Sequence, residues 1–127
     1  MTTLFLVGRI IFAYFWLSNA YSHLFKSAGL IGYSKSKGIP APKLAVIGSG
    51  VLLLVGGLSM LFGVWPFVGI AALVVFLIGT SFAIHNYWKD TDPMAKMNNR
   101  IGFYKNMALL GALLMMVMIP MPWAWSL

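Results

Sequence analysis

The chain has 127 residues, of which 61% are hydrophobic and only 9% are charged, and its formal net charge is +7. A soluble domain carries about a quarter charged residues, so this composition excludes a water-soluble fold and predicts a protein whose solvent is lipid. The absence of cysteine excludes disulfides and thiol-based redox chemistry. The length predicts a single transmembrane domain over residues 1–127.

Four segments are long and apolar enough to cross a bilayer, which requires about 20 residues of helix. They lie near residues 4–25, 44–63, 66–87 and 103–122. The first segment has no basic residue before it, and three more apolar segments follow it. We therefore interpret it as a retained helix rather than a signal peptide. The sequence therefore predicts an all-α fold, an integral membrane antiparallel four-helix bundle, in which the Gly56–Gly57 pair favours close helix packing.

The charged residues gather in two loops, 26–43 and 88–105, which contain eight of the nine lysines and arginines. Two predicted spans separate these loops, so both must lie on the same side of the membrane. The positive-inside rule predicts that both loops are cytoplasmic and that both termini lie outside the cytoplasm. We attribute the basic charge to this topology and expect no nucleic-acid partner. Trp123 and Trp125 are expected to sit at the outer interface, at headgroup level.

Polar side chains inside apolar segments are candidates for function. The first and third segments run in the same direction, so their histidines lie at similar depth, and the fourth segment starts with an asparagine at that level. We therefore predict a polar pocket near the cytoplasmic side. Its expected members are Asn19, His23, His85, Asn86 and Asn106.

Several chemistries suit such a pocket. Histidine and asparagine can hydrogen-bond the carbonyl groups of a quinone, and histidine can also pass protons. Two neutral histidines on facing helices could instead be the axial ligands of a haem, which we favour less. Two histidines make a poor metal site, because zinc requires three or four ligands, so we predict no metal and no catalytic residue. In the structural alternative, His23 and His85 only anchor helix ends at the interface.

Arg9 lies in the first segment, about 21 Å from the predicted pocket along the helix axis. An arginine at the bilayer centre costs about 2.5–3.5 kcal/mol. Because Arg9 is close to the N-terminus, we expect its side chain to snorkel to the outer surface. No predicted span contains an acidic residue, so the C-terminal carboxylate of Leu127 is the nearest candidate partner in topology.

Four stretches of sequence together resemble the DoxX family of small bacterial membrane proteins. They are GRIIFAYFWLSNAYSHLFK, YSKSKGIPAPKL, HNYWKD and NNRIGFYKNMALLGALLM, and they keep the family order over nearly the whole chain. The resemblance implies a four-helix protein of the bacterial inner membrane. Many relatives have a glutamate early in the second helix, near the position of Val51, and this chain lacks it. The matched polar positions are Arg9, Lys26, Pro40, Pro42, His85, Asn86 and Asn106.

The resemblance also implies a link to quinone-dependent oxidation and to oxidative-stress complexes. Our leading hypothesis is an accessory or scaffold subunit of a membrane redox or oxidative-stress complex, with a protein partner and no enzyme activity of its own. The alternative is a quinone-binding, or less favoured haem-binding, oxidoreductase subunit that uses the predicted pocket. A small transporter or channel is the third hypothesis, and it would require the chain to form a homo-oligomer.

Overall fold

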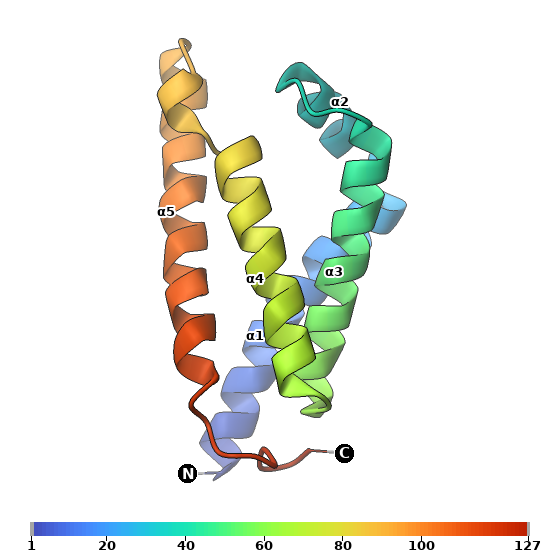
Figure 1. Ribbon diagram of the computed structural model, residues 1–127, viewed down its shortest axis with the longest axis vertical. Helices are drawn as coiled ribbons and strands as arrows, with labels where there is room; N and C mark the ends of the chain where they lie inside the picture. The colour runs from blue at the N-terminus through green and yellow to red at the C-terminus, as the bar shows by residue number, and fades with distance from the viewer. Residues whose placement is uncertain (1, 127) are drawn as a thin grey trace.

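The computed structural model describes residues 2–126, and over that range it contains helices and no strands (Figure 1). The helices are α1 (Thr2–Phe25), α2 (Ala28–Ser36), α3 (Pro42–Phe62), α4 (Pro66–Ala83), the short 3₁₀ turn η1 (Tyr87–Lys89) and α5 (Pro93–Met116). This confirms the predicted all-α fold. Within the described range, the helices long and apolar enough to cross a membrane are α1, α3 and the segment Pro66–Lys89 that contains α4.

The fourth predicted segment, 103–122, is wrong at both ends, because α5 runs from Pro93 to Met116. Its start has a strong local signal, since the Asp92 side chain accepts a hydrogen bond from Ala95 N at 2.9 Å and proline occupies the first turn. The first half of α5 carries several polar and basic residues, so α5 is not among the helices that are apolar enough to cross a membrane by composition. A membrane crossing by α5 therefore stays a prediction.

The other boundaries are closer to expectation. Proline also opens α3 and α4, where its missing N–H removes no helical hydrogen bond. Helix α3 ends at Gly63, whose φ of 67° is readily adopted only by glycine. The third predicted segment, 66–87, is interrupted after Ala83, and α2 is a short helix within the first charged loop, 26–43.

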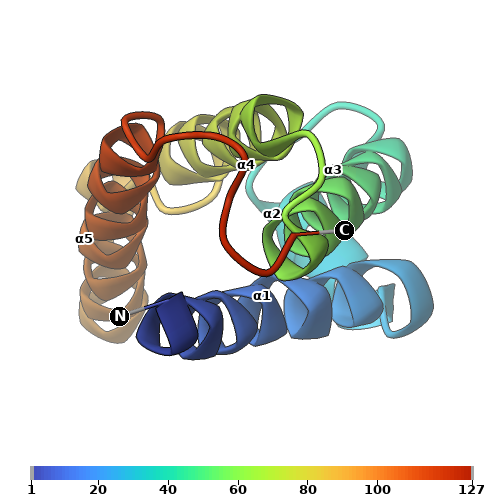
Figure 2. The same cartoon turned by 90° about the horizontal axis from the view of Figure 1, so that it is seen from below.

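Helices α1, α3, α4 and α5 form the sides of the bundle when the molecule is seen along its length (Figure 2). Helix α1 packs on α3, α3 on α4, and α4 on α5. Gly56 permits the α3–α4 contact, because a Cβ atom there would lie 2.3 Å from Leu73 Cγ. Large apolar side chains such as Ile11 and Phe82 are exposed on the outer faces, as expected for a surface in contact with lipid.

The two charged loops lie at the same end of the molecule, as predicted. Lys37 Nζ in the first loop is 3.0 Å from Asp90 Oδ1 in the second. The start of α1 and the C-terminal segment 117–126 lie at the opposite end (Figure 1). We call these the loop end and the terminal end; which of them faces the cytoplasm stays a prediction.

Arg9 does not snorkel, contrary to expectation, but is only 2% exposed. Its Nε donates to Met60 O at 3.0 Å, its Nη2 donates to Leu61 O at 2.9 Å, and its Nη1 donates to Ala124 O. The last carbonyls of α3 have no partner inside the helix, and a cation is favourable at a helix C-terminus. Arg9 therefore ties α1 to the end of α3 and to the C-terminal segment. Leu127, its expected partner, lies outside the described residues.

The C-terminal segment crosses the terminal end of the bundle (Figure 2). Trp123 is 3% exposed and packs edge-on against Phe5, with 5.6 Å between ring centroids. The expectation that Trp123 sits at the membrane interface is therefore wrong. The indole instead fills the core, because Arg9 holds the next carbonyl along the chain. Trp125 is 62% exposed.

Candidate functional site

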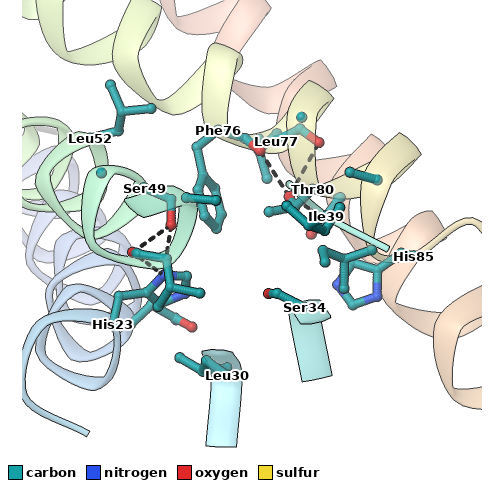
Figure 3. A pocket seen from close by; sticks show the side chains of 18 of the residues that line it. His23, Leu30, Ser34, Ile39, Ser49, Leu52, Phe76, Leu77, Thr80 and His85 are labelled. Atoms are coloured by element: carbon teal, nitrogen blue, oxygen red, sulfur yellow. Dashed lines mark hydrogen bonds between the residues drawn. The ribbon is translucent and has the colours of Figure 1, made fainter. Parts of the chain in front are cut away.

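A cavity of about 590 Å³ lies in the half of the bundle nearest the loop end. Figure 3 shows side chains that line it, among them His23, Ser49, Thr80 and His85. Its walls are mainly apolar and aromatic, and a limited number of polar side chains from every helix interrupt them. This volume and this mixture are typical of small-molecule sites in proteins. None of the lining residues within 2–126 is acidic. The polar lining residues are Asn19, His23, Tyr33, Ser34, Ser49, Thr80, His85, Lys105 and Asn106.

His23 projects from α1 and is held by α3. Its Nδ1 lies 2.8 Å from Ser49 Oγ and 3.2 Å from Val46 O. Ser49 donates its own hydrogen to Val46 O at 2.8 Å, so both neighbours of the ring nitrogen act as acceptors. The Nδ1 atom therefore carries the hydrogen, and in the neutral ring Nε2 keeps a lone pair. Gly50 allows this close approach, since a Cβ there would lie 2.9 Å from His23 Cβ.

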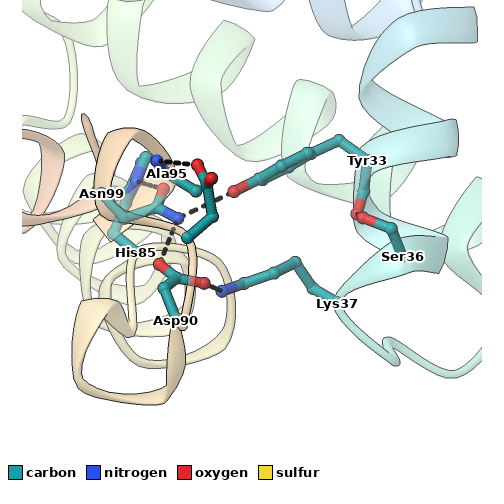
Figure 4. Close-up of polar contacts among 8 residues, drawn as sticks. Tyr33, Ser36, Lys37, His85, Asp90, Ala95 and Asn99 are labelled. Atoms are coloured by element: carbon teal, nitrogen blue, oxygen red, sulfur yellow. Dashed lines mark hydrogen bonds and ion pairs between the residues drawn. The ribbon is translucent and has the colours of Figure 1, made fainter. Parts of the chain in front are cut away.

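His85 lies in the turn after α4 and belongs to a network at the loop end (Figure 4). Its Nδ1 is 3.2 Å from Asn99 Oδ1. Asn99 Nδ2 donates to Asp90 Oδ2 and to the Tyr33 hydroxyl, both at 2.8 Å, and Lys37 pairs with Asp90. A carboxylate only accepts, so the Asn99 amide orientation is settled and His85 Nδ1 must be the donor. We call Tyr33, Lys37, His85, Asp90 and Asn99 the loop-end network.

The loop-end network contains one ion pair, between Lys37 and Asp90, and both residues lie in the charged loops. The hydrogen bond from Asn99, followed by that from Lys37, holds the pKa of Asp90 below its usual value. The ionised carboxylate thus joins the first loop to the second at the loop end. Tyr33 takes part in both structures, because its side chain also lines the cavity.

The two cavity asparagines are held by acceptors of their own helix or a neighbouring one. Asn19 Nδ2 donates to Phe15 O at 2.7 Å. Asn106 Nδ2 donates to Thr80 Oγ1 at 3.3 Å, and the Thr80 hydroxyl donates in turn to Phe76 O at 2.8 Å. Asn19 Nδ2 therefore faces a carbonyl oxygen, which can only accept, and Asn106 Nδ2 faces a hydroxyl oxygen. Each amide leaves its Oδ1 for other contacts.

Four of the five predicted pocket residues line this single cavity: Asn19, His23, His85 and Asn106. Asn86 does not line it. It is 6% exposed, and its Oδ1 has no hydrogen-bond partner within the described range. Arg9 is at the terminal end and takes no part. A ligand-binding role for the four stays a prediction.

Ser49, Thr80, Lys105 and Asn99 also belong to the site or hold its side chains, and the sequence alone did not predict them as members of the pocket. Asn99 fell in a predicted loop, although Asp92 followed by proline is a helix-start signature. A helix started there would have placed Asn99, Gly102 and Asn106 on one face, as observed, since these residues are the buried positions of its polar half. No group of three or more potential metal ligands gathers within residues 2–126.

Long apolar helices around a mainly apolar cavity with a few polar side chains indicate a small helical membrane protein. The DoxX family model matches residues 4–86, more than half of the chain, so the chain belongs to the DoxX family. It is similar to the inner membrane protein YphA of Escherichia coli K12, with 28% identity over 113 residues that cover 89% of this chain and 80% of the relative. No solved structure matches significantly.

Proposed function

We propose that this chain is a membrane subunit that binds the ring of a quinone-type ligand in the loop-end cavity. The observation that carries the proposal is the cavity itself, which combines apolar walls with polar groups converging from α1, α3, α4 and α5. A ring that is apolar on its faces and polar at two edges requires this combination. The aromatic side chains of Phe15, Trp16 and Phe76 in the lining support ring binding, because offset or edge contacts between rings are favourable.

The two histidines would orient such a ligand and exchange protons with it. Each ring is held through Nδ1, by Ser49 in one case and Asn99 in the other. The described residues form no hydrogen bond with either Nε2. Histidine is the side chain best suited to carrying a proton near neutral pH. His85 also belongs to the loop-end network, in which Asn99 links it to the charged side chain of Asp90.

Direct binding tests this proposal. The purified chain in lipid nanodiscs is titrated with a short-tailed benzoquinone, in oxidised and reduced form, and binding is followed by tryptophan fluorescence. We expect saturable binding of at least one form, weakened about tenfold or more by His85→Leu, because about 1.4 kcal/mol corresponds to a factor of ten. Tyr14→Phe, on an outer face, is the control. No binding of either form, or equal binding by His85→Leu, would contradict the proposal.

An accessory role in a membrane redox or oxidative-stress complex is a second candidate, compatible with the first. It is favoured by four apolar and aromatic side chains on α5, each more than half exposed at helical spacing: Met94, Met97, Ile101 and Tyr104. A photo-cross-linker at Ile101 in native membranes should capture one defined neighbour, either a partner protein or a second copy. The same probe at Ile11 should not. Equal capture at both positions would speak against a partner surface on α5.

We also propose that the chain resides in a bacterial inner membrane, with four crossings, cytoplasmic charged loops and both termini outside. Membership of the DoxX family and the likeness to an inner membrane protein support the location. The excess of lysine and arginine at the loop end supports the orientation. No feature of residues 2–126 favours the transporter or channel alternative.

A further inference from the structure

Helices α3 and α4 form a tight pair near the terminal end and separate towards the loop end (Figure 1). Close to the turn that connects them, a Cβ atom at Gly69 would lie only 2.3 Å from Ser59 Oγ. Nearer the loop end, a Cβ atom at Gly48 or Gly79 would meet nothing within 4 Å. The space between the two helices is therefore filled at one end and open at the other.

The cavity reaches the surface of the bundle in this space. Four of its lining residues are exposed there, Leu44 and Gly48 on α3 and Val75 and Gly79 on α4. Leu44 is 73% exposed and Val75 is 59% exposed. The members of each pair are four residues apart, so they lie one above the other on one face of their helix. We call these four residues the side opening.

The side opening is apolar. No residue from 44 to 62 or from 66 to 83 is charged, so a bilayer around α3 and α4 would present hydrocarbon at the side opening. The gap between α1 and α5 differs, because Lys105 Nζ lies there, 5.4 Å from the centre of the Phe15 ring. A hydrocarbon chain in that gap would deprive a cation of water, which is costly.

The cavity itself is polar towards the loop end and apolar towards the middle of the bundle. Helices α1 and α4 both run from the terminal end to the loop end. On α1, Asn19 and His23 lie beyond Phe15 in that direction, and on α4, Thr80 lies beyond Phe76. A ligand that satisfies both parts has a polar group at one end and an apolar remainder.

We propose that the ligand is a membrane-dissolved amphiphile whose ring lies in the cavity and whose long apolar tail leaves through the side opening into the lipid. This inference rests on the proposed function and specifies the class of ligand. A tail in the side opening exchanges lipid contacts for contacts with equally apolar side chains, so it costs little. The ring gains polar partners that hydrocarbon cannot offer.

A pair of ligands tests the proposal on the unaltered chain. Trimethylbenzoquinone has no tail, and its decyl derivative carries one on the same ring. Both are titrated into the chain in nanodiscs, in oxidised and reduced form, with concentrations expressed per lipid so that partition into the bilayer cancels. We expect affinities within about threefold of each other, because the tail stays in an apolar environment. A cavity closed to the bilayer would exclude the decyl compound, which would overturn the inference.

The side opening is then filled. Gly48→Phe combined with Gly79→Phe should weaken binding of the decyl compound, relative to the tailless one, by about tenfold or more, the effect of crowding a packed site. Gly8→Phe combined with Gly111→Phe is the matched control, since a Cβ at either glycine also meets nothing within 4 Å and neither residue lines the cavity. The control should leave both affinities unchanged. Binding of the tailless compound shows that the filled variant is folded.

A diazirine at the end of the tail gives a second, independent measurement. We expect photolabelling of residues 44–52 and 75–79 that an excess of the tailless compound suppresses, because both compounds compete for the ring site. Suppressible labels on α1 or α5, or a filled variant that weakens both compounds equally, would overturn this inference and leave the proposed function standing. Suppressible labelling of the side opening by a diazirine phospholipid would assign it to a lipid chain instead. Binding of neither quinone by the unaltered chain would overturn both proposals.

Discussion

Gly102 is the position where the smallest substitution should disturb the cavity most. A Cβ atom there would lie 2.6 Å from His85 Nδ1, 2.7 Å from Cε1 and 3.0 Å from Cγ. The added carbon would thus meet the ring along one edge, at the atom that donates to Asn99. Gly102→Ala must therefore displace the imidazole and break that hydrogen bond.

The change in the free energy of unfolding is the sum of two losses and one gain. Loss of the hydrogen bond costs about 1 kcal/mol, and crowding of a tightly packed site costs about 1–3 kcal/mol. Replacing glycine by alanine in a helix interior returns about 1 kcal/mol. The free energy of unfolding should therefore fall by about 1–3 kcal/mol, and ligand affinity should fall together with it because His85 lines the cavity.

Gly111 on the same helix is a matched control, because a Cβ there meets nothing within 4 Å. Gly111→Ala should be neutral, or stabilise the chain by up to about 1 kcal/mol. Both variants are unfolded from mild detergent by increasing amounts of a denaturing detergent, and helicity is followed by circular dichroism. If Gly102→Ala is as stable as Gly111→Ala, the close contact between α5 and His85 is refuted.

Three further predictions concern the ends of the bundle. Arg9→Leu leaves three carbonyl oxygens without their donor, which lowers the free energy of unfolding by about 1–3 kcal/mol for each buried group. The variant should also make the C-terminal segment sensitive to carboxypeptidase. Unchanged protection would contradict the role of Arg9. The lowered pKa of Asp90 implies stability that is fully present above the ordinary carboxyl pKa and is lost as the pH falls through the folded value. The destabilisation by Asp90→Asn, measured by thermal unfolding, should therefore be constant near neutral pH and fade below about pH 4; a difference that persists in acid would refute the assignment. Because both termini are proposed to lie outside the cytoplasm, an alkaline phosphatase fused after the last residue should be active. One inserted after Ser36, in a proposed cytoplasmic loop, should be inactive. The reverse pattern would invert the proposed topology.

Much of the fold could be predicted from local signals. Hydropathy located α1, α3 and α4, although it ran past the end of α4, and the spacing along these helices brought Asn19, His23 and His85 to one level. Helix α5 was misplaced because its first half is polar, so hydropathy began ten residues too late even though Asp92 and Pro93 mark the start. For the same reason Asn99, which holds His85, was not considered part of the site.

The sequence alone determined the class of protein, the apolar helices and the depth of the polar residues, since length, composition and periodicity are properties of neighbouring residues. Only the tertiary structure decided what each polar group contacts. Arg9 reaches carbonyls 51, 52 and 115 residues away, and no local pattern predicts such partners. The character of the cavity was decided in the same way, because His23 and His85 offer acceptors only once their donors are bound by groups from other helices.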